Sequence, residues 1–319
     1  MMIITTLAAM TAGYLLGVMF GTPSAISARK LLSKLCGSLA PRFSRSYQDS
    51  DDGQSTGGGF YIALVLIITI IPTAALLFVL YWKLPVAALV VDSLLCWSVM
   101  DIKEQSRLSQ AAARTVRSGN TAKAAKFASK LGRVDCSNYE TEDLIRASVQ
   151  GTADRTVDSA AAPLFYMVLL SGLGGLIFRA ADAAASADVS EAFLAPSKKL
   201  RDFLCFIPGK LAMIILLVDA FFLKMNVHAA ERVMRQDRKK CSRKAFGGCR
   251  AVLAGLLGIS LLPEEFYVAQ FSRSFTIGEQ VSDIDAGDIT IANQLMLGTA
   301  FIIMALFFMI KLTVGVFVG

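Results

Sequence analysis

The apolar residues of this chain are concentrated in blocks of about twenty, and this distribution constrains the fold more than any other feature. About twenty apolar residues in a helix cross the roughly 30 Å hydrocarbon core of a bilayer. Hydrophobic residues make up 55% of the chain and charged residues 18%, a balance that is unusual for a soluble domain. The sequence therefore predicts an integral membrane protein whose first partner is the lipid bilayer. The blocks lie at 2–20, 60–82, 85–100, 160–180, 203–223 and 291–316.

No stretch of useful length alternates apolar and polar residues as a half-buried strand would, so an all-α fold is predicted. The expected architecture is a polytopic integral membrane protein with about five to six hydrophobic helices and helical cytoplasmic loops. We expect a single membrane domain over residues 1–319. Its parts are N-terminal spans and a hairpin at 1–100 with a flexible loop at 44–59, a helical segment at 101–159, and C-terminal spans at 160–319 with a basic loop at 224–250.

Lysine and arginine are concentrated in three of the segments between apolar blocks, 22–59, 101–159 and 224–250. Cytoplasmic loops carry an excess of these residues, so we expect all three on the cytoplasmic side of the cell's inner membrane. The first apolar block is followed, not preceded, by the basic residues Arg29 and Lys30. A cleavable signal has the opposite order, which predicts that this block is a retained helix.

The sequence allows two courses of the chain through the block at 160–180. Gly172, Gly174 and Gly175 interrupt it, and glycine weakens a helix interior. It either crosses the membrane or enters and turns back, which is tolerated where protein or water covers the backbone. The shorter block 251–262 cannot span, and we expect it to be buried or interfacial.

Several classes of site are not indicated. The net charge is +7, but the basic residues are not interleaved with aromatic ones as in a nucleic-acid platform, so no nucleic-acid partner is expected. None of the six cysteines forms a C-x-x-C pair, and His228 has no cysteine at zinc-ligand spacing. There is no Walker loop and no G-x-G-x-x-G motif. The sequence thus carries no zinc, haem or dinucleotide signal.

The segment 101–159 has the pattern of three helices. A break at 118–120 separates the first two, and Asn120 or Thr121 can cap the second. Ser137 and Glu140 have the spacing of a capping box, which predicts a third helix from about 138 to 158.

A polar ladder runs along this third helix. Its members recur every four residues and so share one helix face: Arg146, Gln150, Asp154 and Asp158. Asp154 and Asp158 could hold Mg²⁺, which prefers oxygen ligands. Spacing alone favours a solvated helix face instead. The position of Asp158 beside an apolar block favours a functional site, because ionisable groups at a membrane edge need partners or water.

Two other features have a plain structural explanation. Gly13, Gly17 and Gly21 are spaced for close helix packing, which need not involve a dimer. The basic run RQDRKKCSRK at 235–244 could hold phosphates of a nucleotide or substrate. Contact with anionic lipid explains its charge equally well.

Three stretches match the motifs of one known family in their order and spacing, most clearly over 131–166. The matching residues are Leu131-Gly132-Arg133, Arg146-Ala147, Val149, Ala153, Asp158 and Ala162-Pro163-Leu164-Phe165-Tyr166, then Phe178-Arg179-Ala180, Asp182, Asp202, Ile207-Pro208 and Lys210-Leu211, then Asp237, Gly247 and Ala254-Gly255-Leu256-Leu257-Gly258. On these residues the chain resembles the adenosylcobinamide-phosphate synthases of cobalamin biosynthesis (the CobD/CbiB family).

The resemblance implies an ATP-dependent ligase that joins a carboxyl of the corrinoid adenosylcobyric acid to the amine of aminopropanol or its phosphate. ATP would convert the carboxylate into a better acyl donor, and Mg²⁺ would screen the phosphates. The acids at or near the family's acidic positions would be catalytic, the first two also as metal ligands: Asp154, Asp158, Asp182 and Asp202. The cations near them would bind substrate or phosphate: Arg133, Arg146, Arg179 and Lys210.

The chain also departs from the family pattern at several motif positions. The residues that replace family side chains include Gln150, Asp154, Arg155, Ser159, Ala185, Cys205 and Cys241. An active enzyme is the interpretation we favour, and a catalytically degenerate membrane relative that acts as a scaffold or regulatory partner is the alternative. A small-solute transporter has weaker support, since only the glycines of a broken helix suggest it. Assembly into a homo-oligomer is left open.

Overall fold

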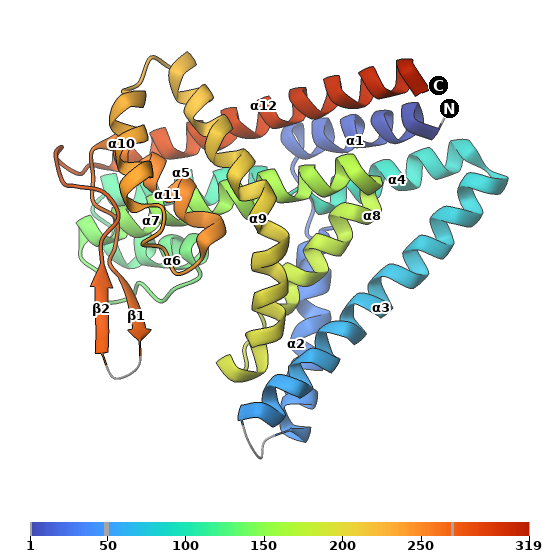
Figure 1. The fold of residues 1–319 in the computed structure, drawn as a ribbon, viewed down its shortest axis with the longest axis horizontal. Coiled ribbons are helices and arrows are strands. Elements are labelled where there is room, and N and C mark those ends of the chain that lie inside the picture. Colours follow the sequence, from blue (N-terminus) through green and yellow to red (C-terminus); the bar gives the residue numbers. More distant parts are fainter. Residues whose placement is uncertain (1, 48–50, 269–270, 319) are drawn as a thin grey trace. The chain divides into compact units, whose positions relative to one another are not determined.

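The computed structural model describes residues 2–47, 51–268 and 271–318, and almost all of them are helical (Figure 1). The all-α fold is therefore confirmed. In chain order the elements are α1 (Met2–Met19), α2 (Ala28–Ser46), α3 (Asp51–Lys83), α4 (Pro85–Val99), α5 (Ile102–Arg117), α6 (Thr121–Gly132), α7 (Thr141–Arg155), the π-helical η1 (Thr156–Ala161), α8 (Ala162–Ala184), α9 (Glu191–Phe222), α10 (Val227–Asp237), α11 (Lys244–Leu257), β1 (Glu264–Val268), β2 (Phe271–Phe275) and α12 (Ala286–Val318).

Five helical segments in the described part of the chain are long and apolar enough to cross a membrane. The predicted first span is a shorter apolar helix, Thr5–Met19. Large apolar side chains such as Phe78, Trp82 and Phe301 are exposed on the long segments, as lipid-facing residues are. The chain is a multi-pass membrane protein. The five segments are Asp52–Lys83, Pro85–Arg117, Thr141–Ala184, Glu191–Phe222 and Ala286–Phe317.

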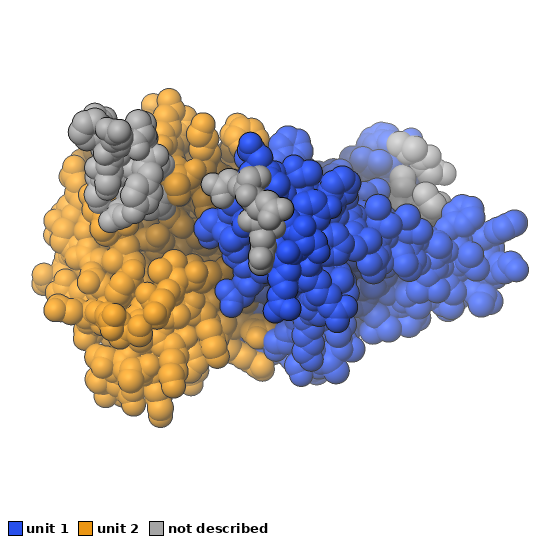
Figure 2. Space-filling view, turned by 90° about the horizontal axis from the view of Figure 1, so that it is seen from below, with its two compact units in different colours: residues 1–103, 162–204, 304–319 blue, residues 104–161, 205–303 orange. Residues whose placement is uncertain are grey.

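The chain divides into two compact units, each built from separate stretches of sequence (Figure 2). Unit 1 contains residues 1–103, 162–204 and 304–319. Unit 2 contains residues 104–161 and 205–303. The long helices α9 and α12 each contribute one part to unit 1 and another to unit 2.

In unit 1, α1 packs closely along α4. A Cβ atom at Gly13 would collide with the backbone and Cβ of Cys96, and one at Gly17 would lie 2.9 Å from Cβ of Met100. The interpretation of the glycine repeat as a helix-packing motif is confirmed, because these glycines let the two backbones approach each other.

The flexible loop expected at 44–59 is largely helical. Its first residues end α2, and α3 begins at Asp51, while residues 48–50 lie outside the described part. Close packing explains the glycines that suggested flexibility. A Cβ atom at Gly58 would collide with the carbonyl oxygen of Phe193 in α9, and one at Gly57 would lie 2.6 Å from the ring of Tyr47. A neighbouring residue lies against each of these positions, and only glycine fits there without displacing it. Glycine content alone therefore led to the wrong prediction of a flexible loop.

The block at 160–180 turns back on itself. Helical geometry breaks in α8 at Leu170 (φ −130°, ψ 20°) and Ser171 (φ 53°, ψ −142°). The rings of Tyr166 and Phe178 then stack with centroids 5.9 Å apart, whereas twelve residues of straight helix would separate them by about 18 Å. The backbone therefore reverses direction within α8, as the second of the two courses requires of the chain.

Asp92 of α4 stabilises this reversal. Its Oδ1 accepts a hydrogen bond of 2.9 Å from the backbone N–H of Gly172, and its Oδ2 accepts one of 2.8 Å from the hydroxyl of Tyr81. Asp92 is buried. A broken helix leaves backbone groups without their helical partners, and a buried carboxylate is a strong acceptor for such a group.

In unit 2, α6 packs on α7 through small side chains, and the two helices border the candidate site described below. Asn120 caps α6 by accepting a hydrogen bond of 3.0 Å from the N–H of Lys123, as predicted. The predicted capping box of α7 is wrong: the helix begins at Thr141, and Ser137 instead donates its N–H to Asp135 in a local turn. The block 251–262 is, as expected, a buried segment, since it includes the end of α11.

A short antiparallel hairpin, β1–β2, follows α11, with Glu264 paired to Phe275. Sequence analysis did not predict it, because its strands are only five residues long and lack clear alternation.

Replacing Asp92 with alanine should lower the free energy of unfolding by about 1–3 kcal/mol, because a buried donor and a half-buried donor would lose their acceptor. The variant Asp92→Asn keeps an oxygen acceptor for Gly172 and should lose less. Thermal unfolding of the full chain in detergent compares the three proteins. An alanine variant as stable as the parent would show that the reversal in α8 does not depend on Asp92.

Candidate functional site

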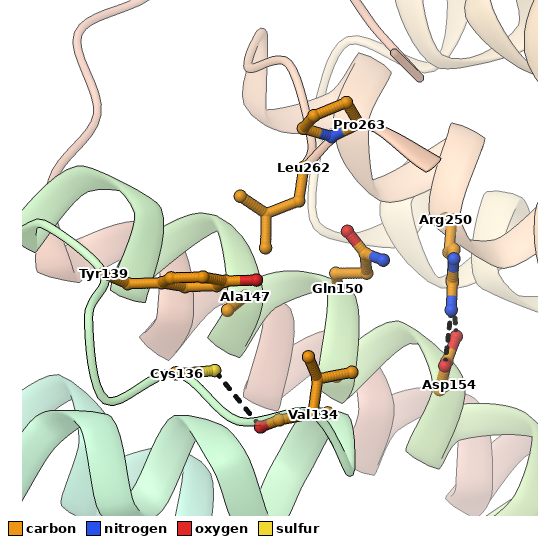
Figure 3. A pocket seen from close by; sticks show the side chains of 11 residues that line it. Val134, Cys136, Tyr139, Ala147, Gln150, Asp154, Arg250, Leu262 and Pro263 are labelled. Carbon is orange, nitrogen blue, oxygen red and sulfur yellow. Dashed lines mark hydrogen bonds and ion pairs between the residues drawn. The ribbon is translucent and has the colours of Figure 1, made fainter. Parts of the chain in front are cut away.

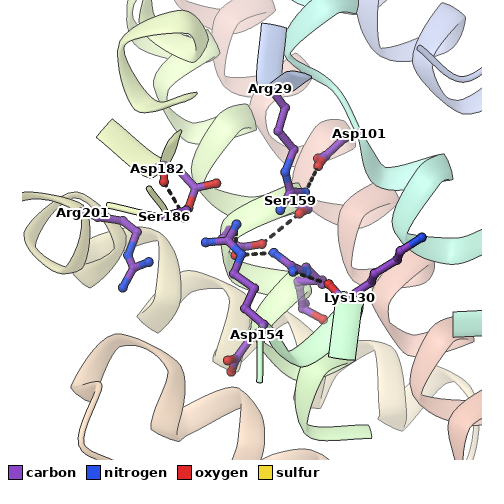
Figure 4. A network of polar contacts seen from close by, with 12 residues as sticks. Arg29, Asp101, Lys130, Asp154, Ser159, Asp182, Ser186 and Arg201 are labelled. Carbon is purple, nitrogen blue, oxygen red and sulfur yellow. Dashed lines mark hydrogen bonds and ion pairs between the residues drawn. The ribbon is translucent and has the colours of Figure 1, made fainter. Parts of the chain in front are cut away.

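The polar ladder of α7 is interrupted by the π-helical turn η1, which covers Thr156–Ala161. A π turn adds a residue to the helical repeat and is often found at functional sites. It begins two residues after Asp154, so Asp154 and Asp158 do not continue one regular ladder. Figure 4 shows the side chain of Asp154 directed away from Ser159, the neighbour of Asp158. The two acids accordingly have different partners.

Asp154 is held by a buried, two-point ion pair with Arg250 of α11. Its Oδ1 lies 2.7 Å from Nε of Arg250, and its Oδ2 lies 2.7 Å from Nη2 (Figure 3). Nη1 of Arg243 lies 3.7 Å from the same Oδ2. Burial opposes the charge of Arg250, but the Asp154 carboxylate outweighs it and raises the pKa of the guanidinium. Arg250 therefore stays charged at neutral pH.

Asp158 is also bound by arginine. Its Oδ2 lies 3.0 Å from Nη1 of Arg155 and 3.4 Å from Nη2 of Arg133, and its Oδ1 accepts a hydrogen bond of 2.8 Å from the hydroxyl of Ser159. Arg155 in turn donates to the carbonyl oxygen of Lys130 at 2.9 Å. Asp158 thus links η1 to the end of α6, where Arg133 has a left-handed backbone (φ 57°). Arg155 and Ser159, which depart from the family motif, are two of its partners.

A cavity of about 250 Å³ opens beside the Asp154–Arg250 pair (Figure 3). Oε1 of Gln150 is buried there and accepts no hydrogen bond from any residue that the structure describes. Burial raises the pKa of Cys136 and of Tyr139, so the thiol and the phenol are neutral at pH 7. The lining residues are Gly132, Val134, Cys136, Tyr139, Ala147, Gln150, Gly151, Asp154, Arg250, Leu262 and Pro263.

This arrangement favours an anionic or dipolar ligand. Arg243 and Arg250 both contact Asp154, and Arg133 and Arg155 both contact Asp158. Guanidinium groups match the planar oxygens of carboxylates and phosphates. Each acid therefore holds two groups of a kind that binds such anions.

The same donor set does not suit a divalent cation. Each of the two acids proposed as Mg²⁺ ligands is already contacted by two arginines. The described residues contain no group of three or more His, Cys, Asp or Glu side chains placed to hold a metal. A Mg²⁺ ion at Asp154 or Asp158 would have to displace those arginines or lie beside their charge.

The predicted cations have different surroundings. Arg146 donates to the carbonyl oxygen of Ser260 at 2.5 Å and to its hydroxyl, and so ties α7 to the segment after α11. Lys210 lies in α9 and lines a separate cavity. Arg133 is thus the predicted cation that the structure brings to Asp158.

The other predicted residues belong to unit 1. Arg179, fully buried on the returning arm of α8, donates to the carbonyl oxygen of Val99 at 2.8 Å and pairs with Asp101. Asp182 lies 3.9 Å from Arg179, and Asp101 is also bound by Arg29 (Figure 4).

Asp202 is partly exposed on α9, and its Oδ1 lies 3.4 Å from Nη2 of Arg201. In unit 1 the structure therefore brings Arg179 and Asp182 together.

Sequence reasoning missed three charged residues: Arg250, which pairs with Asp154, Asp101, which pairs with Arg179, and Asp92 at the break in α8. Arg250 lies in the apolar stretch GGCRAVLAG, and Asp92 and Asp101 lie within or beside the block 85–100. A charged residue inside an apolar block requires a buried partner, so each was a signal that could have been used.

The family model described as "CobD/Cbib protein" matches residues 10–296. The chain belongs to the CobD/CbiB family. It is 23% identical to a cobalamin biosynthesis protein CobD of Clostridium perfringens, covering 89% of this chain and 91% of that protein. It is 26% identical to a CbiB protein of Salmonella arizonae, covering 68% and 70% of the two chains. No solved structure matches the chain.

Replacing Arg250 with methionine should destabilise the protein by about 3–5 kcal/mol, because the Asp154 carboxylate would lose its two-point partner in a buried site. The double variant Asp154→Asn with Arg250→Met should cost clearly less than the sum of the single changes. Unfolding midpoints in detergent measure this coupling, with the exposed Arg232→Met as a control. Simple additivity of the two single effects would contradict the pairing.

Proposed function

We propose that this chain performs the amide-forming step of cobalamin biosynthesis that its family membership implies. The amine of aminopropanol, or of its phosphate, would be joined to a propionate carboxyl of adenosylcobyric acid. The match over residues 10–296, and relatives named as cobalamin biosynthesis proteins, support this assignment. The single observation that locates the proposed reaction in the molecule is the cavity beside Gln150, bordered by the Asp154–Arg250 pair.

The charges of the cavity suit the reactants of this step. A carboxylate and a phosphate are the anionic groups that the reaction brings together, and arginine binds both in defined orientations. In our proposal Asp154 and Asp158 position Arg250, Arg243 and Arg133, and these guanidinium groups bind the anionic reactants. These acids then act through the arginines they hold.

Gln150 would orient the amine. Its amide oxygen can accept a hydrogen bond from an N–H group of the amino alcohol, although it cannot act as a base. A cavity of about 250 Å³ has room for a small amino alcohol or its phosphate. The walls formed by Val134, Leu262 and Pro263 would limit water around the attacking nitrogen.

ATP, when bound, would activate the corrinoid carboxylate by converting it into a better acyl donor. The arginine-bound state of Asp154 and Asp158 supports a phosphate site more than a Mg²⁺ site there, so we route no step through the metal. The contacts of Arg146 and Arg179 with backbone carbonyls support positioning roles. Asp182 and Asp202, in unit 1, stay candidates for contact with substrate.

We also propose that the enzyme lies in the cell's inner membrane with segments 22–59, 101–159 and 224–250 in the cytoplasm. Their lysine and arginine content supports this orientation. The cavity beside Gln150 is built from two of these segments and the turn after α11, so soluble reactants would have access to it.

Purified full-length protein given adenosylcobyric acid, aminopropanol phosphate and Mg-ATP should form the amide and release ADP. Mass spectrometry of the corrinoid and an ADP assay provide two independent readouts. The absence of turnover at every pH tested, in a folded sample, would contradict the proposal and favour a scaffold or regulatory role.

The variant Gln150→Ala should raise the KM for the amino alcohol by about three- to tenfold, the loss expected for one neutral hydrogen bond. Its effect on kcat should be smaller if Gln150 orients bound substrate. Gln110→Ala on the exposed face of α5 is the matched control and should change neither constant. An unchanged KM in Gln150→Ala would remove this residue from the binding site.

A further inference from the structure

A second cavity, of about 620 Å³, lies in unit 2 between α9 and the basic segment that joins α10 to α11. The proposed function does not use it. Four cations line it, together with apolar residues and glycine: Lys210, Arg238, Lys239 and Lys244, then Phe206, Gly209, Met213, Ala245 and Gly248. Lys210 comes from α9 and the other three from residues 238–244, so the fold concentrates positive charge from two stretches of the sequence at this place.

No acid in the described part of the chain pairs with these four side chains. All four are exposed. Their neighbours Lys240 and Arg243 behave differently, because Lys240 lies 2.6 Å from Asp237 and Arg243 lies 3.7 Å from Asp154. The segment thus directs some of its cations to acids and others to the cavity. Four unpaired cations around one cavity favour an anion.

The first turn of α11 adds to this field. Lys244 and Ala245 begin the helix, and the N–H groups of a helix N-terminus, which lack partners within the helix, attract phosphate. Close packing brings this turn to α9: a Cβ atom at Gly209 would collide with the carbonyl oxygen of Ala245, and one at Gly248 would lie 2.5 Å from Sδ of Met213.

The wall formed by α9 is apolar and faces outward. Large side chains on this part of the helix are exposed, among them Phe206, Ile207, Ile214 and Val218. Lys210 lies three residues after Ile207 and four before Ile214, so it shares their helix face. Its ammonium lies 4.0 Å from the ring centroid of Phe206. Since α9 belongs to a segment able to span a membrane, this face is suited to contact lipid.

We propose that this cavity binds the headgroup of an anionic phospholipid. The lipid phosphate is held by Lys210, Arg238, Lys239 and Lys244, and an acyl chain lies along the exposed apolar face of α9. Basic pockets beside membrane helices bind anionic lipid headgroups in this way. A soluble phosphate compound would use the cations but would leave the apolar face uncovered, so the lipid accounts for both features. The inference does not rest on the proposed enzymatic activity.

The test uses the full chain, purified in neutral detergent and titrated with phosphatidylglycerol or phosphatidylcholine under native mass spectrometry. The parent should retain phosphatidylglycerol in preference to phosphatidylcholine. The double variant Lys210→Gln with Lys239→Gln should weaken phosphatidylglycerol binding at least about tenfold. The control, Arg232→Gln with Arg235→Gln, loses the same charge on α10 outside the cavity and should change binding by less than about twofold.

A second variant controls for the possibility that the double variant misfolds. Lys244→Gln, at the exposed start of α11, should weaken lipid binding by about threefold while keeping the parent's unfolding midpoint in lipid-free detergent. Equal losses in the cavity and control variants, or equal retention of the two lipids by the parent, would overturn the proposal. Displacement of phosphatidylglycerol from the parent by inorganic pyrophosphate would also overturn it, because the cavity would then be a site for soluble phosphates.

Discussion

The two-point ion pair between Asp154 and Arg250 is the interaction on which the candidate site depends. It joins α7 to α11, although 96 residues separate the two side chains in the sequence. A buried charge without a partner is very costly, so this pair requires the two helices to stay together. The cavity beside Gln150 lies against it, and Arg243 reaches the same carboxylate. This one ion pair thus forms part of the cavity wall and determines the charge and shape of the site.

The same requirement accounts for the irregular parts of the helices. In unit 2 the π turn η1 contains Asp158, whose Oδ2 is contacted by two arginines. In unit 1 the reversal of α8 is stabilised by Asp92, and its returning arm carries Arg179, which pairs with Asp101. Regular helices need no side-chain partner for their backbone, whereas breaks do. The departures from regular helix therefore coincide with charged residues that have partners from other elements.

The sequence predicted what depends on local composition. Apolar blocks longer than about twenty residues predict spans because bilayer thickness alone demands that length. The cap at Asn120 was found because capping acts within one turn. The partner of Asp154 was not found, since nothing in the sequence near α7 identifies Arg250. The glycines at 57–59 suggested a flexible loop, yet Gly58 is small because Phe193 lies against it. Both of these errors reflect a contact with another segment of the chain.

The central claim is that the acids of this site position arginines that bind an anion. Equilibrium binding of aminopropanol phosphate to the full chain tests it most directly, measured with EDTA and then with Mg²⁺. We predict that binding persists in EDTA and is lost in a folded Arg250→Lys variant, whose ammonium cannot reproduce the two-point contact. Binding that is absent in EDTA and restored by Mg²⁺ would contradict the account and return Asp154 and Asp158 to the role of metal ligands.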